Sequence, residues 1–191
     1  MKTGRLEAFS DGVLAIIITI MVLELKVPED GTFQALNHLI PKFISYLLSF
    51  IYVGIYWNNH HHLFQIVEKV NGKILWANLT LLFFLSLIPF STAWMGENHF
   101  EQNTVAVYGI NLFLCAVSFN IVQKAAMDSE GKDSLIAKAI KNYTKEMAST
   151  ALYLIGIAIS FFYPKISLIL FFTVAIIWLI PDRRIEKQVK H

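Results

Sequence analysis

Residues 5–25 read RLEAFSDGVLAIIITIMVLEL, and this stretch decides the class of fold. Its uninterrupted apolar part, residues 12–23, would form only about 18 Å of helix. A hydrocarbon core of about 30 Å needs about 20 residues, so a spanning helix must also hold Ser10, Asp11 and Glu24 near membrane depth. Ionisable groups there are costly and usually face a bundle interior or water. The first helix is therefore predicted to be more than an anchor.

The rest of the chain has the same apolar character. Of its 191 residues, 55% are hydrophobic and 16% are charged, whereas a soluble domain carries about 25% charged residues. The apolar block at residues 148–180 would be about 50 Å long as one helix, and Pro164 and Lys165 interrupt it, which favours two short spans. Six spans are predicted, at about residues 8–25, 40–64, 74–95 and 104–127, with two more inside residues 148–180.

These observations predict an all-α, polytopic membrane protein with a single six-helix transmembrane domain over residues 1–191. The net charge of +2 gives no argument for nucleic acid as a partner. The single cysteine, Cys115, lies in an apolar run, so no disulfide framework is expected. No cofactor is predicted.

Lysine and arginine are distributed unevenly along the predicted spans. With six spans and the N-terminus inside, 13 of the 16 basic residues fall on the inner side, and Lys26, Lys42 and Lys165 fall outside. The inner group is Lys2, Arg5, Lys69, Lys73, Lys124, Lys132, Lys138, Lys141, Lys145, Arg183, Arg184, Lys187 and Lys190. Cytoplasmic segments carry such an excess. The chain is therefore predicted to be a multi-pass protein of the cell membrane with both termini in the cytoplasm.

The predicted topology gathers polar residues of the first three spans near the inner side. They are Arg5, Ser10 and Asp11, then Trp57, Asn58, Asn59, His60, His61 and His62, then Trp76 and Asn78. Asp11 is expected to accept a hydrogen bond from one of these donors, and Arg5 is a further candidate to pair with it, because an unpaired buried charge is expensive. Three consecutive histidines spread over about 200° of a helix, so a hydrogen-bonded network is favoured over a zinc site. A pH-sensing role for these histidines stays open.

One face of the first span carries Ile16, Ile20 and Leu23 at i, i+4 and i+7, with Thr19 beside them. An ordinary packing stripe is one interpretation. A narrow pore wall is the other, since a lipid-facing helix would not need the acidic groups at its two ends. Hydrophobic constrictions can gate by dewetting, and hydroxyl or acidic rings favour cations.

The stretch 5–25 resembles the signature of the lysosomal potassium channel family, transmembrane protein 175, and its prokaryotic homologues. The resemblance rests on Arg5, Phe9, Ser10 and Asp11, followed by an apolar helix. YWNNHHHLF at 56–64 and LWANLTLLFFLSLIPF at 75–90 are similar to the second and third helices of the family. The resemblance implies six-span subunits in membrane lipid, which assemble as homotetramers with the first helix lining the pore.

The same resemblance implies roles for particular residues. The narrowest point of the pore maps to Ile16, further pore-facing positions map to Ile20 and Leu23, and a hydroxyl layer implicated in potassium preference maps to Thr19. The polar motif residues, with partners among the inner polar residues named above, would hold the pore helix in place. The predicted function is a potassium-permeable cation channel without enzymatic activity, whose only metal is the permeant potassium ion.

Two other functions remain as alternatives. A proton-coupled secondary transporter would use Asp11, Glu24 and the cluster His60–His62. Transporters usually contain repeats with helices broken at the midplane, and the first span has no internal proline and no midplane glycine. An intramembrane enzyme is disfavoured because the sequence lacks the H-E-x-x-H and G-x-S-x-G motifs and paired carboxylates at a catalytic spacing.

Overall fold

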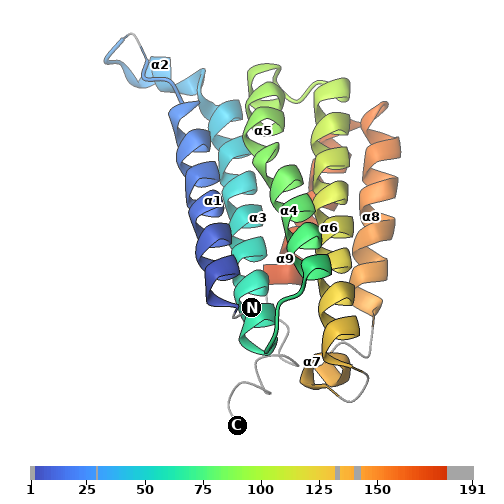
Figure 1. The fold of residues 1–191 in the computed structure, drawn as a ribbon. Coiled ribbons are helices and arrows are strands. Elements are labelled where there is room, and N and C mark those ends of the chain that lie inside the picture. The colour runs from blue at the N-terminus through green and yellow to red at the C-terminus, as the bar shows by residue number, and fades with distance from the viewer. Residues whose placement is uncertain (1–2, 29, 132–133, 140–142, 180–191) are drawn as a thin grey trace.

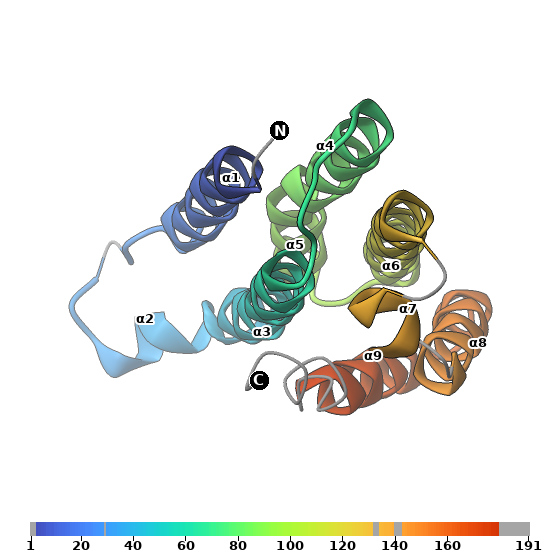
Figure 2. The same ribbon diagram turned by 60° about the horizontal axis from the view of Figure 1, so that its bottom comes forward.

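The computed structural model describes residues 3–28, 30–131, 134–139 and 143–179, and its regular structure there is entirely helical (Figure 1). The helices are α1 (Gly4–Leu23), α2 (Phe33–Asn37), α3 (Ile40–Gln65), α4 (Gly72–Ser86), α5 (Ile88–Glu97), α6 (Gln102–Glu130), α7 (Leu135–Ala139), α8 (Thr144–Ser160) and α9 (Pro164–Leu179). The long helices run side by side, with α1 and α8 on opposite sides of the bundle (Figures 1 and 2). The predicted all-α class is confirmed.

Four segments of the described chain are long and apolar enough to cross a membrane. They are α1, α3, the pair α4–α5 taken together as Gly72–Glu97, and α6. The other two predicted spans correspond to α8, with 17 residues, and α9, with 16 residues. The predicted interruption of the last apolar block is confirmed, because α8 ends at Ser160 and α9 begins at Pro164.

The third predicted span is divided by a proline. Pro89 lies in the first turn of α5, where it has no N–H to donate to a carbonyl of α4, and its ring would clash with a continuing helix. α4 therefore ends at Ser86, and α5 continues in a new direction from Ile88. At the far end of α5, Lys42 Nζ lies 3.0 Å from Glu97 Oε1, and this ion pair joins α5 to the start of α3.

α1 packs by one face only. Its buried residues recur every three or four positions and contact α3, α4 and α5. These residues are Leu6, Ser10, Leu14, Ile17 and Met21. Because most of the remaining side chains of α1 are exposed, the helix lies at an edge of the bundle, beside α3 and α4 (Figure 2).

The two groups of basic residues predicted from the sequence belong to segments at opposite ends of the bundle. α1, α4 and α8 begin at the end where α3 and α6 finish (Figure 1). This end carries Arg5, Lys69, Lys73, Lys124 and Lys145, and the segments at the other end carry Lys26, Lys42 and Lys165. Lys2, Lys132, Lys141, Arg183, Arg184, Lys187 and Lys190 lie outside the described residues, as does the side chain of Lys138.

Candidate functional site

The residues predicted to line a pore share the open face of α1. The exposed fraction is 60% for Ile16, 43% for Ile20 and 72% for Leu23. Thr19 is exposed between them. Three branched aliphatic side chains and one hydroxyl therefore form a continuous strip that no helix of the same chain covers within the described residues.

The hydroxyl proton of Thr19 has a fixed direction. Its Oγ1 donates a hydrogen bond to the carbonyl oxygen of Ala15, one turn earlier, at 2.8 Å. A threonine hydroxyl has one proton and two acceptor lone pairs. Since the proton is directed to the helix backbone, the outward side of this oxygen is electron-rich, which is what a bare cation requires.

A directed chain of hydrogen bonds fixes the opposite face of α1 to α3 and α4. Ser10 Oγ donates to the carbonyl oxygen of Leu6 at 2.9 Å, so this oxygen is left as an acceptor. Asn78 Nδ2 donates to Ser10 Oγ at 2.9 Å. His60 Nε2 lies 2.9 Å from Asn78 Oδ1, and because an amide oxygen only accepts, the proton is on Nε2. All three side chains are buried, and these hydrogen bonds pair polar atoms of three helices with one another.

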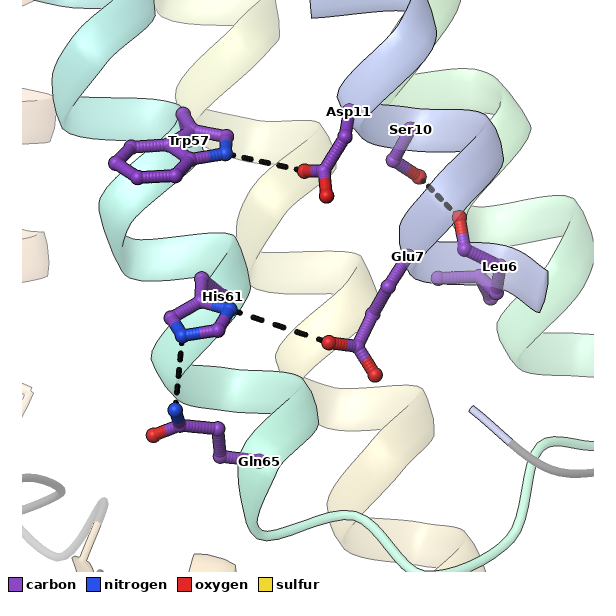
Figure 3. Close-up of polar contacts among 7 residues, drawn as sticks. All are labelled: Leu6, Glu7, Ser10, Asp11, Trp57, His61 and Gln65. Atoms are coloured by element: carbon purple, nitrogen blue, oxygen red, sulfur yellow. Dashed lines mark hydrogen bonds and ion pairs between the residues drawn. The ribbon is translucent and has the colours of Figure 1, made fainter. Parts of the chain in front are cut away.

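Two further contacts connect α1 to α3, one helical turn apart (Figure 3). Trp57 Nε1 donates to Asp11 Oδ1 at 3.1 Å, so Asp11 accepts a hydrogen bond from the next span as predicted. One turn away, His61 Nδ1 lies 3.9 Å from Glu7 Oε2. The Gln65 amide nitrogen lies 2.8 Å from His61 Nε2 and donates to it, so the His61 ring turns its Nδ1 proton toward Glu7. The indole of Trp57 stacks on His61, with ring planes at 12°.

Five of the inner polar residues named from the sequence lie outside these contacts: Arg5, Asn58, Asn59, His62 and Trp76. Arg5 is exposed, and no ion pair joins it to Asp11 in the part of the chain that the structure describes. Trp76 is 74% exposed on the outer surface of α4. His62 has a buried Nδ1 with no hydrogen-bond partner among the described residues. The three consecutive histidines therefore have different surroundings, as their spread around the helix requires.

Comparison with known proteins identifies the family. A family model described as "Endosomal/lysosomal potassium channel TMEM175" matches residues 5–89. A protein of Chryseobacterium sp. named as a potassium channel is 59% identical over 190 residues, which are 100% of this chain and 99% of that protein. The chain belongs to the TMEM175 family.

The relatives extend from bacteria to vertebrates. The crystal structure of a lysosomal potassium-selective channel TMEM175 homolog from Chamaesiphon minutus matches with a TM-score of 0.81 and 32% identity, over 94% of this chain and 97% of that one. The zebrafish protein named endosomal/lysosomal proton channel TMEM175 is 32% identical over 130 residues, covering 64% of this chain and 24% of that protein. The segment matched by the TMEM175 family model contains all the polar contacts that join α1 to α3 and α4.

Glu7 and Gln65 were not among the residues predicted from the sequence, and Trp57 was predicted only as one of several donors. A signal was present. Glu7 and Asp11 are four residues apart on one helix, and Trp57 and His61 are four residues apart on the next. Two antiparallel helices with such pairs on facing sides can form two contacts one turn apart, which is the arrangement that this member of the TMEM175 family has.

Proposed function

We propose that this chain is the subunit of a potassium channel in which four copies surround a central pore lined by α1. Relatives of the same length are named as potassium channels, which supports the ion. The observation that carries the pore assignment is the division of α1 into a buried face and an open face with Ile16, Thr19, Ile20 and Leu23. Because this family consists of channels, the chain is not an enzyme.

In this proposal α8 and α9 are the fifth and sixth spans. With 17 and 16 residues they rise about 24 to 26 Å, close to the lower limit for a spanning helix. Local thinning of the bilayer accommodates such a mismatch at a fraction of a kcal/mol per Å. The excess of lysine and arginine at the end where α1 begins supports an orientation with that end, and both termini, in the cytoplasm of a cell-membrane protein.

The proposed mechanism follows from the chemistry of the open face. Four copies of Ile16 would form an apolar ring around the pore axis. An ion would cross this ring only when it widens enough for water to fill it. The hydroxyl oxygens of Thr19, one turn further along, would offer ligands to a partly dehydrated cation. Asp11 and Glu24, near the two ends of the strip, would raise the local concentration of cations. The contacts of Ser10 and Asp11 with α3 and α4 would hold this face toward the axis.

Flux through reconstituted protein tests this proposal. Liposomes that contain the chain should pass potassium down a gradient, and Ile16→Asn should raise flux severalfold because a polar ring lowers the dewetting barrier. The matched control is Ile155→Asn on α8, on the opposite side of the bundle, where the side chain is also exposed. Unchanged flux and selectivity for substitutions at Ile16, Thr19 and Ile20 would rule out α1 as the pore lining.

The same liposomes separate the channel from a proton-coupled transporter. A transporter that used Asp11, Glu24 and His60–His62 would show saturable potassium flux that follows a proton gradient. The channel proposal expects flux that follows voltage in the absence of a proton gradient. Because the zebrafish relative is named a proton channel, a pH-sensitive dye inside the liposomes should be read in parallel to compare the two ions.

A further inference from the structure

A groove runs along the outer surface between the packed helices α4 and α6, near the end where α4 begins and α6 finishes. It is open, with a volume of about 1040 Å³. Lys73, Trp76 and Thr80 line it from one face of α4, at i, i+3 and i+7. Ile121, Lys124 and Asp128 line it from α6 at the same spacing. Two helices thus contribute one matching strip each.

Positive charge gathers in one half of this groove. Lys73 and Lys124 are both exposed and come from opposite walls. α4 begins here, so the backbone N–H groups of Gly72 and Lys73 are among the four that intrahelical bonding leaves over. The partial positive charge of a helix N-terminus adds to that of the lysines. This half of the groove is suited to an anion.

The acidic groups nearby reduce this charge without cancelling it. Asp128 lines the groove and carries one negative charge against the two lysines. Glu130, two residues further along, turns its Oε1 to the backbone N–H groups of Glu68 and Lys69, at 3.0 and 3.2 Å. Asn71 Nδ2 donates to Ser129 Oγ at 3.0 Å and ties the start of α4 to the end of α6. The groove therefore has fixed walls at its polar end.

The other half of the groove is apolar and faces outward. Trp76 is 74% exposed and Ile121 is 48% exposed, each one turn further from the polar end than the lysine on its own helix. Tryptophan is enriched where membrane proteins cross from hydrocarbon to headgroups. Along about 10 Å of α4, the surface changes from cationic to aromatic and aliphatic, which is the polarity gradient of one bilayer leaflet.

We propose that this groove binds one anionic phospholipid, with its phosphate between Lys73 and Lys124 and an acyl chain along Trp76 and Ile121. Basic pockets between transmembrane helices bind anionic headgroups through the same combination of charge and apolar surface. The proposal rests on the placement of the bundle in a bilayer that the proposed function assumes. Its failure would leave the channel proposal intact, because potassium flux is measured separately.

Native mass spectrometry of the purified assembly provides the test. Binding of phosphatidylglycerol is compared with binding of phosphatidylcholine that has the same acyl chains. The double variant Lys73→Gln/Lys124→Gln should bind phosphatidylglycerol about 25-fold more weakly, since each lysine near anionic lipid contributes about fivefold. The control Lys26→Gln/Lys165→Gln removes the same charge at the other end of the bundle and should leave this binding unchanged.

The variant Asp128→Asn distinguishes a loss of lipid binding from a failure to fold. It removes the opposing charge, so it should tighten phosphatidylglycerol binding severalfold, which misfolding would not do. Equal binding of the two lipids, or equal loss in the test and control variants, would overturn the proposal. Displacement of the lipid by soluble glycerol phosphate would assign the groove to a free phosphate. Loss of assembly in the double variant alone would assign it to a second copy of the chain.

Discussion

Ser10 determines which atom donates and which accepts in the series of hydrogen bonds that joins α1 to α3 and α4. Its proton goes to the Leu6 carbonyl, its oxygen takes the Asn78 amide proton, and the amide oxygen then takes the proton of His60. A polar group in a helix bundle without nearby water costs several kcal/mol if it lacks a partner. The small hydroxyl therefore permits two larger polar side chains to stay buried beside the largely apolar helix α1.

Ser10→Ala should lower the stability of the folded protein in detergent by about 1 to 2 kcal/mol, because it leaves the buried Asn78 amide without an acceptor. The measurement is thermal unfolding followed by circular dichroism. Ser86→Ala is the matched control, since the exposed Ser86 donates only to the Phe83 carbonyl in its own helix. Equal shifts for the two variants would mean that the chain of hydrogen bonds contributes nothing across helices.

At the scale of the elements, α6, α8 and α9 meet around one aromatic ring. Phe171 of α9 is fully buried and lies against glycines of both neighbouring helices. A Cβ added to Gly109 would clash with Phe171 Cζ, and one added to Gly156 would lie 2.6 Å from Phe171 Cε1. Small residues permit close approach of transmembrane helices, and here they make room for the ring.

Gly109→Ala and Gly156→Ala should each destabilise the protein by about 1 to 3 kcal/mol, because the ring has to move out of a well-packed site. Gly54→Ala in α3 is the control, since nothing lies within 4 Å of its added Cβ. In a Phe171→Leu background, the cost of Gly109→Ala should fall by more than half, which a double-mutant cycle measures. An unchanged cost in that background would show that the glycine matters for another reason.

The predictable part of the elements is the part encoded by local spacing. Hydropathy gave the approximate bounds of the long helices, and the i, i+4 pattern put Ile16 and Ile20 on one face. The partner of Asp11 depends on how far α3 is rotated and shifted along α1, and hydropathy does not encode this. Trp57 was therefore one donor among several until the helices were placed. The break between α4 and α5 was indicated locally by Pro89, but the continuous apolar run around this proline favoured a single span.

At the scale of the whole molecule, the edge position of α1 has a consequence for assembly. The branched aliphatic residues on the open face of α1 can pack equally well against lipid or against another protein surface. The acidic and hydroxyl oxygens of α1, however, keep acceptor positions that the contacts with Trp57 and Ala15 leave unused, and lipid chains have no donors for them. If four chains assembled with this face inward, their four Leu23 side chains would lie close to one another. Leu154 on α8 would face outward from the assembly.

Cysteine cross-linking tests this arrangement directly. Cys115 is the only cysteine and is buried, so Leu23→Cys introduces a single accessible thiol on the open face of α1. A short bifunctional maleimide should link copies of this variant in liposomes, and a denaturing gel should show covalent dimers, because one thiol per chain joins chains in pairs. Leu154→Cys, with 51% exposure on α8, is the control and should remain monomeric on the gel. Dimers of equal yield from both variants would indicate random collision, and their absence from Leu23→Cys would place α1 away from any shared axis.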